Sequence, residues 1–319
     1  MGIQQIVNRF GALALGAVLT CVSFVPVAQA AIQPAAPVAA RSSSLELAST
    51  SALVIDLANG RELYASNADI QVPIASITKL MTAMVTLDAN LPMEEEIPVI
   101  IRDTKELQGV FSRVKVGSVQ TRRELLQLAL MSSENRAASA LAHNYPGGHA
   151  AFVRAMNQKA RELGMRQSRF SEPTGLSERN VSSARDLVLM LLGAYQYPLI
   201  RELSTTPNRS VQFRNPVYSQ SFGNTNPLVR DAEWQIQLSK TGFTDEAGHC
   251  LVMLARLAGR PTAVVLLDSF GKQTRVADAN RLRRWIETGQ SSPIPAAARY
   301  YRQQKLQYFR QLQLQRGAG

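Results

Sequence analysis

Serine, lysine and asparagine side chains occur in the sequence at spacings that could support nucleophilic catalysis. A Ser-x-x-Lys pair brings a hydroxyl and an amine together on a helix, because positions i and i+3 share one face. Three such pairs occur, and they begin at Ser76, Ser112 and Ser269. Only Ser76, paired with Lys79, precedes an apolar run with helical spacing, in residues 80–87. A serine at a helix N-terminus also lies beside free N–H groups that favour a developing oxyanion.

The other two pairs lie in segments without helical character. Residues 112–119 alternate polar and apolar side chains, which predicts a half-exposed strand whose positions i and i+3 face opposite ways. Ser269 lies in a loop-like Ser-Phe-Gly-Lys stretch. Even the pair at Ser76, taken alone, is more typical of a helix cap followed by a surface lysine.

Two further motifs, each occurring once, favour a catalytic role for Ser76 and Lys79 over that of a helix cap and a surface lysine. The Ser-Glu-Asn motif at 133–135 falls at the break between two predicted helices, where side chains can point into a cleft. The Lys-Thr-Gly motif at 240–242 ends the strand-like run 235–238, and its glycine would let a substrate backbone approach closely. Either motif alone could be ordinary helix punctuation or a basic strand end. In this order and at these spacings, the three motifs resemble the active-site set of penicillin-binding proteins and serine β-lactamases.

The segments around these motifs extend the resemblance to one family. They are similar to D-alanyl-D-alanine endopeptidases of the penicillin-binding protein 7 type, over about residues 45–297. The similar segments are 73–82, 130–137, 144–148, 172–176, 240–244 and 247–250. The resemblance implies an α+β fold of the serine β-lactamase/DD-peptidase kind, with an antiparallel sheet flanked by helices.

The resemblance implies a catalytic role for three side chains. Ser76 would be the acylated nucleophile, and Lys79 would be a neutral amine that accepts its proton. Ser133 would pass that proton to the leaving amine. No metal or organic cofactor would be needed.

Four further positions would bind the substrate. Asn135 would hold the substrate amide, while Lys240, with Thr241 beside it, would bind the substrate carboxylate. The backbone N–H groups of Ser76 and Phe243 would form the oxyanion hole.

The implied reaction is hydrolysis of D-Ala–diaminopimelate cross-links in peptidoglycan by a serine endopeptidase, through an acyl-enzyme. β-Lactam antibiotics would then be covalent inhibitors. Three alternatives remain open: a D-alanyl-D-alanine carboxypeptidase, a β-lactamase, and a catalytically weak cell-wall-binding protein. The intact serines and lysines argue against the last of these.

Glu172 bears on the β-lactamase alternative. It follows Ser133 at about the distance at which a class A β-lactamase keeps its deacylating glutamate. That motif ends in Leu-Asn, whereas Glu172 leads into Pro-Thr-Gly-Leu. We therefore interpret Glu172 as structural, with a catalytic role as the alternative.

The pattern along the chain predicts strands at both ends and helices between them. Hairpin turns are expected at Asn59-Gly60 and at Gly259-Arg260. The predicted strands are 52–55, 62–65, 251–255 and 263–267, and the predicted helices are 76–87, 125–131, 134–144, 149–163, 183–194 and 276–287. A capping box at 121–124 opens the second helix. This order favours one α+β domain, at 45–290, whose terminal strands complete one antiparallel sheet.

Residues 1–30 have the pattern of a secretory signal peptide. An apolar run follows Arg9 and ends in Ala28-Gln29-Ala30, the small-x-small form that signal peptidase cleaves. The run is at the short end for a membrane span, so an uncleaved anchor is the minor alternative. Cleavage after Ala30 predicts a periplasmic protein with Cys250 as its only thiol, preceded by an Ala/Pro-rich linker at 31–44.

The chain is basic, with 35 Lys and Arg against 24 Asp and Glu among its 319 residues. That balance indicates an anionic partner, and peptidoglycan fits it, whereas export and the lack of a recognition motif argue against nucleic acid. The three histidines have no metal-type spacing. The tail at 291–319 carries five cations, no acid and several aromatic residues, which predicts a frayed, solvated end or weak peripheral membrane association. We expect a monomer.

Overall fold

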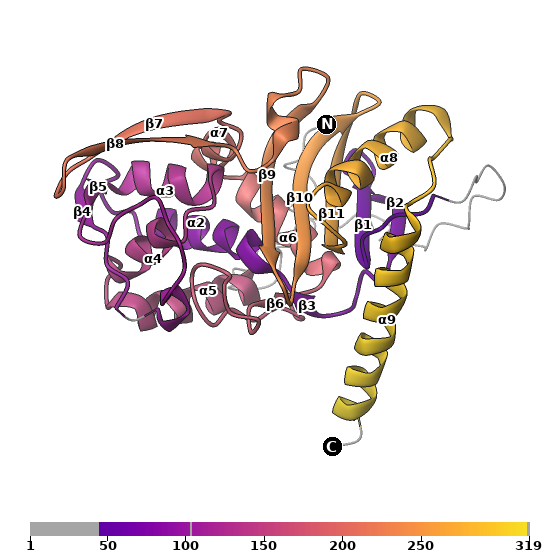
Figure 1. Cartoon of the computed structure of the whole chain (residues 1–319), viewed down its shortest axis with the longest axis horizontal. Helices are drawn as coiled ribbons and strands as arrows, with labels where there is room; N and C mark the ends of the chain where they lie inside the picture. The colour runs from indigo at the N-terminus through magenta and orange to yellow at the C-terminus, as the bar shows by residue number, and fades with distance from the viewer. Residues whose placement is uncertain (1–44, 103, 318–319) are drawn as a thin grey trace, which may run out of the picture.

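The structure, a computed structural model, describes residues 45–102 and 104–317 (Figure 1). The expected signal peptide and linker, at 1–30 and 31–44, lie outside the described residues. The fold is α+β, as expected: an antiparallel sheet of five strands in the order β2-β1-β11-β10-β9 has helices on both sides. These strands are β1 (Ser51–Asp56), β2 (Arg61–Ser66), β9 (Gln235–Thr244), β10 (Gly248–Leu257) and β11 (Arg260–Ser269).

The two ends of the chain meet in this sheet, as the order of predicted elements indicates. Strand β1 pairs with β11, so that Leu53 lies opposite Val265. The turn between β1 and β2 forms at Asn59-Gly60, where Gly60 has a φ of +75° and Asn59 Oδ1 accepts from the N–H of Arg61 at 3.0 Å. The second predicted turn, at Gly259-Arg260, is displaced by one residue: Ala258 and Gly259 join β10 to β11, and Arg260 already pairs with Leu257.

Both faces of the sheet are buried, because successive side chains of a strand point to opposite faces. Leu53 and Val265 pack into the larger core, with the helices that precede β7. Their neighbours Val54 and Leu266 pack on the other face, with Leu282 of α8. Helix α2 is the centre of the larger core, where it contacts α3, α4, α5 and α6.

Eight α-helices are described; six have bounds close to those predicted from hydrophobic spacing, whereas α7 and α9 were not predicted. Thr121 caps α3 as the capping box requires, because its hydroxyl accepts from the N–H of Glu124 at 3.1 Å. The helices are α2 (Lys79–Asp88), α3 (Arg122–Met131), α4 (Asn135–His143), α5 (Gly148–Glu162), α6 (Ala184–Tyr195), α7 (Pro198–Ser204), α8 (Thr274–Thr288) and α9 (Ala296–Gly317). Short 3₁₀ turns occur at η1 (Ala75–Thr78), η2 (Lys105–Leu107) and η3 (Pro227–Arg230).

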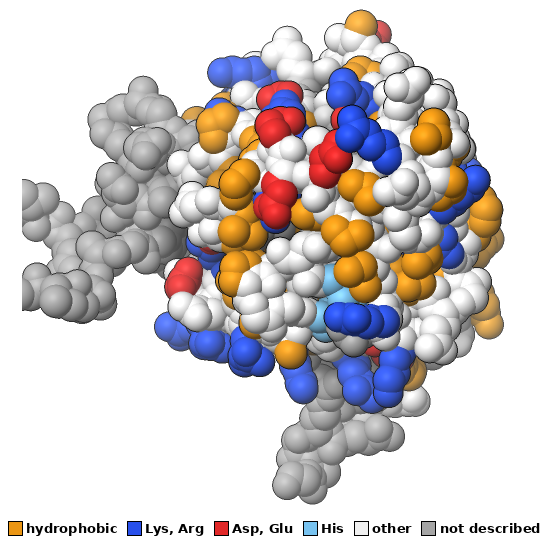
Figure 2. Space-filling view, turned by 90° about the vertical axis from the view of Figure 1, so that its left-hand side faces the viewer, with side chains coloured by type: hydrophobic (Ala, Val, Ile, Leu, Met, Phe, Trp, Pro, Cys, Tyr) orange, Lys and Arg blue, Asp and Glu red, His pale blue; other side chains and the backbone are white. Residues whose placement is uncertain are grey.

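Three two-stranded ribbons join the helices, and the sequence patterns predicted none of them. They are β3 (Val72–Pro73) with β6 (Val181–Ser182), β4 (Glu96–Pro98) with β5 (Val119–Thr121), and the hairpin of β7 (Asn208–Phe213) with β8 (Tyr218–Gly223). The helical end of the molecule shows small groups of apolar side chains separated by charged and polar ones (Figure 2).

Two expectations about local structure are wrong. The strand expected at 112–119 is a loop up to residue 118, in which Ser112 bonds to Glu134, just before α4, and Ser118 bonds to Tyr218 of β8. The C-terminal end is not frayed, since α9 is a helix tied to the domain. Arg299 forms an ion pair with Glu46 at 2.9 Å, and the hydroxyl of Tyr301 donates to Asp268 at 2.6 Å. No helix among the described residues is long and apolar enough to cross a bilayer.

Candidate active site

Ser76 lies at the start of the helical segment, as predicted, but in the 3₁₀ turn η1 directly before α2 rather than in the first turn of an α-helix. Ala75 just before it has a φ of +45°, a conformation that L-residues rarely adopt. Lys79 is the first residue of α2, and its Nζ donates to the Ser76 hydroxyl at 2.8 Å. The expected i, i+3 geometry of the pair is therefore present at the point where the turn becomes a helix.

The amine of Lys79 is buried and contacts only neutral oxygens. Besides Ser76, it donates to Asn135 Oδ1 at 2.8 Å and to the carbonyl of Thr174 at 2.6 Å. The Lys79 side chain has 0% exposure. Burial penalises the charged form, and this lowers the pKa of Lys79 from 10.5 to about 7. At neutral pH, a large fraction of Lys79 is thus an uncharged amine that can accept a proton from a hydroxyl.

Glu172 holds the loop that presents the Thr174 carbonyl to Lys79. Its carboxylate accepts from the N–H groups of Thr174 and Gly175, both at 2.6 Å, and from Asn180 Nδ2 at 2.8 Å. Gly175 has a φ of +84°, and a Cβ there would lie 1.9 Å from the Ala75 carbonyl oxygen. The loop therefore packs against the nucleophile turn, and the Glu172 carboxylate is engaged within the loop.

The Ser-Glu-Asn motif stands at the break between α3 and α4, as expected. Ser133 has a φ of +62° there, and its hydroxyl accepts from Lys240 Nζ at 2.9 Å. Asn135 begins α4 and faces Lys79. The break thus brings Ser133 against one buried lysine and Asn135 against the other.

The Lys-Thr-Gly motif lies within β9, which is the edge strand beside η1, rather than at the end of a strand as expected. A Cβ on Gly242 would lie 3.1 Å from the Ser76 nitrogen, so β9 passes directly along the nucleophile turn. Lys240 has 1% exposure, and its pKa lies well below the usual range because of burial, reinforced by the charges of Lys79 and Arg275. The hydroxyl of Thr241 donates to the Thr225 hydroxyl at 2.6 Å.

Phe243, next along β9, has a ring that is 52% exposed. The ring stacks on His249 of β10 with a centroid distance of 4.2 Å. Arg275 of α8 donates to His249 Nδ1 at 2.5 Å. Burial and the charges of Arg275 and Lys272 lower the pKa of His249 to about 4, so this imidazole is neutral and positions the Arg275 guanidinium.

Cys250, the neighbour of His249 along β10, has 0% exposure. Its Sγ lies 3.4 Å from the Ala247 carbonyl oxygen. Burial raises the pKa of Cys250 to about 12, which keeps the thiol protonated and excludes it as a nucleophile.

The other two Ser-x-x-Lys pairs do not form a comparable dyad. The Ser112 hydroxyl donates to Glu134 at 2.7 Å, and Ser269 shares a hydrogen bond with Ser49 at 2.6 Å. Among the residues that the structure describes, no three His, Cys, Asp or Glu side chains are grouped so as to hold a metal ion.

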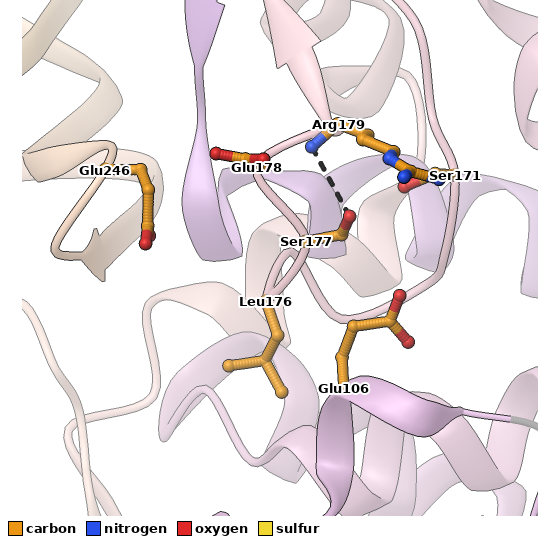
Figure 3. Close-up of a pocket in the computed structure, with 7 residues that line it drawn as sticks. All are labelled: Glu106, Ser171, Leu176, Ser177, Glu178, Arg179 and Glu246. Carbon is orange, nitrogen blue, oxygen red and sulfur yellow. Dashed lines mark hydrogen bonds between the residues drawn. The ribbon is translucent and has the colours of Figure 1, made fainter.

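A cavity of about 440 Å³ lies beside the loop that carries Glu172, and none of the three motifs lines it (Figure 3). Leu176, which borders it, follows the Gly175 that packs against Ala75. Glu246, from the turn between β9 and β10, and Glu106, from η2, approach the cavity from other sides. The cavity is lined by Glu106, Ser171, Leu176, Ser177, Glu178, Arg179 and Glu246.

Three contributors to this site carry no signal that the sequence patterns could reveal. The Thr174 carbonyl is a backbone group, so its residue type says nothing of its contact with Lys79. Thr225 reaches Thr241 from a loop outside every motif. Arg275 lies on α8 and reaches the site only because that helix packs on the sheet.

The chain is similar in sequence to known peptidases. The profile of a family described as D-alanyl-D-alanine carboxypeptidase matches residues 37–271. The chain is 60% identical over 260 residues to a D-alanyl-D-alanine endopeptidase of Pseudomonas aeruginosa, covering 82% of this chain and 84% of the relative. It is 54% identical over 289 residues to an Escherichia coli protein of the same name, covering 91% and 92%.

The fold is similar to solved structures of a DD-transpeptidase and a penicillin-binding protein. A mutant of the Streptomyces K15 DD-transpeptidase superposes with a TM-score of 0.68 at 26% identity, covering 75% of this chain and 98% of that one. Penicillin-binding protein D2 of Listeria monocytogenes, in its cefotaxime-bound form, superposes with a TM-score of 0.66 at 30% identity, covering 76% and 98%.

Proposed function

The chain belongs to the D-alanyl-D-alanine carboxypeptidase family of serine DD-peptidases, and we propose that it is an endopeptidase that hydrolyses D-Ala–diaminopimelate cross-links in peptidoglycan. The observation that carries the proposal is the 2.8 Å contact between the hydroxyl of Ser76 and a buried Lys79 whose pKa is about 7. Endopeptidase is favoured because the relatives at 54% and 60% identity bear that name.

Acylation begins with transfer of the Ser76 proton to Lys79 Nζ. The Ser76 oxygen attacks the carbonyl carbon of the substrate D-Ala, and the N–H groups of Ser76 and Phe243 stabilise the resulting oxyanion. Collapse of this intermediate breaks the amide C–N bond and leaves an ester on Ser76. The leaving amine takes its proton from Ser133, which is replenished by the proton held on Lys79.

The Ser-Glu-Asn and Lys-Thr-Gly motifs orient the substrate. Asn135 offers its amide N–H to the substrate backbone while its Oδ1 accepts from Lys79. Lys240 binds the carboxylate next to the scissile bond, and the Thr241 hydroxyl joins it when its proton turns from Thr225 to that carboxylate. Water then hydrolyses the ester, with Lys79 again as the base.

β-Lactams are covalent inhibitors in this scheme, because their ring amide acylates Ser76 and the opened ring stays bound. Glu172 is occupied by hydrogen bonds from its own loop, so no carboxylate is free there to activate a deacylating water. A long-lived penicilloyl-enzyme, rather than β-lactam turnover, is the expected result.

A carboxypeptidase is the second candidate, since the family description carries that activity and several relatives at 27–30% identity are named for it. Chromatography of purified muropeptides after incubation with the enzyme separates the two. Monomers released from a cross-linked dimer support the endopeptidase, whereas free D-alanine from a pentapeptide monomer without dimer cleavage overturns it.

The proposed reaction also indicates where the enzyme works and which residues form its catalytic domain. Peptidoglycan cross-links lie outside the inner membrane, so the enzyme works in the periplasm after cleavage behind Ala30. Residues 45–290 form the catalytic domain, which acts as a monomer and needs no cofactor, and 291–319 form the basic tail. Membrane association through that tail is peripheral and weak, because Arg299 is already paired with Glu46 and Lys305 donates to the Glu246 carbonyl.

A further inference from the structure

A loop at 105–114 lies against the site without taking part in the proposed chemistry. Ser112 Oγ donates to Glu134 Oε2 at 2.7 Å, and Arg113 Nε donates to Glu134 Oε1 at 3.0 Å. Glu134 is 6% exposed and stands between Ser133 and Asn135. The loop is thus attached to the middle residue of the Ser-Glu-Asn motif.

Further contacts hold this end of the loop from two other sides. The guanidinium carbon of Arg113 lies 4.4 Å from the centre of the Phe222 ring on β8. Arg136 of α4 donates to the Val114 carbonyl at 2.8 Å. Because α4 and β8 are parts of the folded domain, these contacts give the loop one fixed position beside Ser133.

The opposite end of the loop borders the cavity that Leu176 also lines, one residue after the Gly175 that packs against Ala75. Glu106 lines that cavity across from Leu176 and the loop that follows it (Figure 3). Leu107 beside it is 2% exposed and anchors η2 in the protein. The loop therefore runs from this cavity to the Ser-Glu-Asn motif of the candidate active site.

Phe111 lies between these two anchored ends and is 85% exposed. Its neighbour Ser112 is tied to Glu134, so the backbone that carries the ring is held in place. A large apolar ring kept in water next to a catalytic motif gains free energy when a ligand covers it. A stem peptide of peptidoglycan offers such cover through its alanine methyl groups and the methylene chain of diaminopimelate.

We propose that the loop at 105–114 is a wall of the substrate groove, and that Phe111 is a specificity-determining residue which contacts the stem peptide away from the scissile bond. This inference rests on the proposed function. A penicillin carries no stem peptide, so its acylation of Ser76 is expected to be independent of Phe111.

The test compares two reactions of the full-length protein and its Phe111→Ala variant. One is cleavage of a purified cross-linked muropeptide dimer, and the other is acylation by a fluorescent penicillin. Loss of the apolar contact is expected to lower kcat/KM for the dimer about tenfold, while the acylation rate constant stays within about twofold. Phe111→Leu keeps an apolar side chain and is expected to restore most of the dimer cleavage.

Tyr300→Ala is the matched control, since Tyr300 is an exposed aromatic residue on α9 and is 66% exposed. It is expected to cleave the dimer at the wild-type rate. Equal dimer cleavage by Phe111→Ala and the wild type overturns the inference, and so does an equal loss of dimer cleavage and penicillin acylation. A wild-type enzyme that releases no monomer from the dimer overturns the proposed function itself.

Discussion

The amine of Lys79 lies 2.8 Å from the hydroxyl of Ser76, and the lysine side chain that carries it has no exposure to solvent. No carboxylate among the described residues forms an ion pair with this amine; its acceptors are Ser76, Asn135 and the Thr174 carbonyl. A charged ammonium is costly in such surroundings, so the protein holds a base beside its candidate nucleophile.

Ser76→Ala is expected to abolish covalent labelling by a fluorescent penicillin, because the acylated oxygen is removed. Ser112→Ala and Ser269→Ala are matched controls and should label at the wild-type rate, since their hydroxyls bond to Glu134 and Ser49 instead of a lysine. Gel fluorescence after a time course measures all four proteins. Undiminished labelling of Ser76→Ala would falsify the assignment of the nucleophile.

The acylation rate should rise with pH through about 7, since Lys79 must lose its proton to act as a base and its pKa is about 7. The charge of Glu134 raises the pKa of Lys79. Glu134→Gln removes that charge, so the acid limb of the pH profile should move to lower pH. Stopped-flow acylation from pH 5 to pH 9 measures the shift. A limb that stays in place or moves upward contradicts this electrostatic account.

Lys240→Met should lower the efficiency of dimer cleavage about tenfold or more, because a charged hydrogen bond to the substrate carboxylate is lost. The melting temperature should stay the same or rise, since Lys240 is 1% exposed and no carboxylate among the described residues offsets its burial. Differential scanning fluorimetry and dimer cleavage give the two readouts. Unchanged cleavage with a lower melting temperature would make Lys240 a structural residue.

Glu172→Ala should lower the free energy of unfolding by about 2–4 kcal/mol, since it leaves buried N–H groups of the loop without acceptors. Urea denaturation checks this value.

The wild-type penicilloyl-enzyme should hydrolyse slowly. Rapid β-lactam turnover that disappears in Glu172→Gln would instead make Glu172 a catalytic residue and favour the β-lactamase alternative.

Truncation after Ser292 should leave penicillin labelling intact at low temperature and lower the melting temperature. The truncation removes α9, whose Phe309 is 5% exposed in the larger core and whose Tyr301 hydroxyl lies 2.6 Å from Asp268. Tyr301→Phe, which removes only that hydrogen bond, should lower the free energy of unfolding by about 1 kcal/mol. A truncated protein as stable as the full chain would mean that α9 contributes nothing to the folded domain.

Binding of the full chain to anionic lipid vesicles tests the proposed tail attachment. Sedimentation should show weak binding at low salt, lost at 0.5 M salt, because the attraction between exposed charges is screened. The truncation after Ser292 is the control. Equal sedimentation of both proteins at low salt, or binding that survives high salt, contradicts the electrostatic attachment.

Local sequence patterns were sufficient for much of the framework. The capping box at 121–124 predicts the start of α3, and the dipeptide Asn59-Gly60 predicts the turn between β1 and β2. These features depend on neighbours a few residues apart, whose interactions any chain with that sequence makes. The same holds for the Ser76–Lys79 pair, since a spacing of i, i+3 brings the two side chains together wherever the helix begins.

Two local patterns predict the wrong structure, because contacts with residues distant in the sequence determine the fold of those segments. The alternating segment 112–119 predicts a strand, yet Ser112 bonds to Glu134 and becomes part of a loop. The basic tail predicts a frayed end, yet Tyr301 bonds to Asp268 of β11. In both cases the partner is distant in sequence, and its position depends on how the helices and the sheet pack.

The chemistry of the site divides in the same way. The sequence by itself determined which groups are present: Ser76, Lys79 and the two later motifs, in an order that resembles one family. The burial of the Lys79 amine away from solvent depends on the folded protein, because Asn135 and the Thr174 carbonyl contact it from segments far along the chain. Since desolvation depends on everything packed around a side chain, the change from an ordinary lysine to a base with a pKa of about 7 is a property of the tertiary structure.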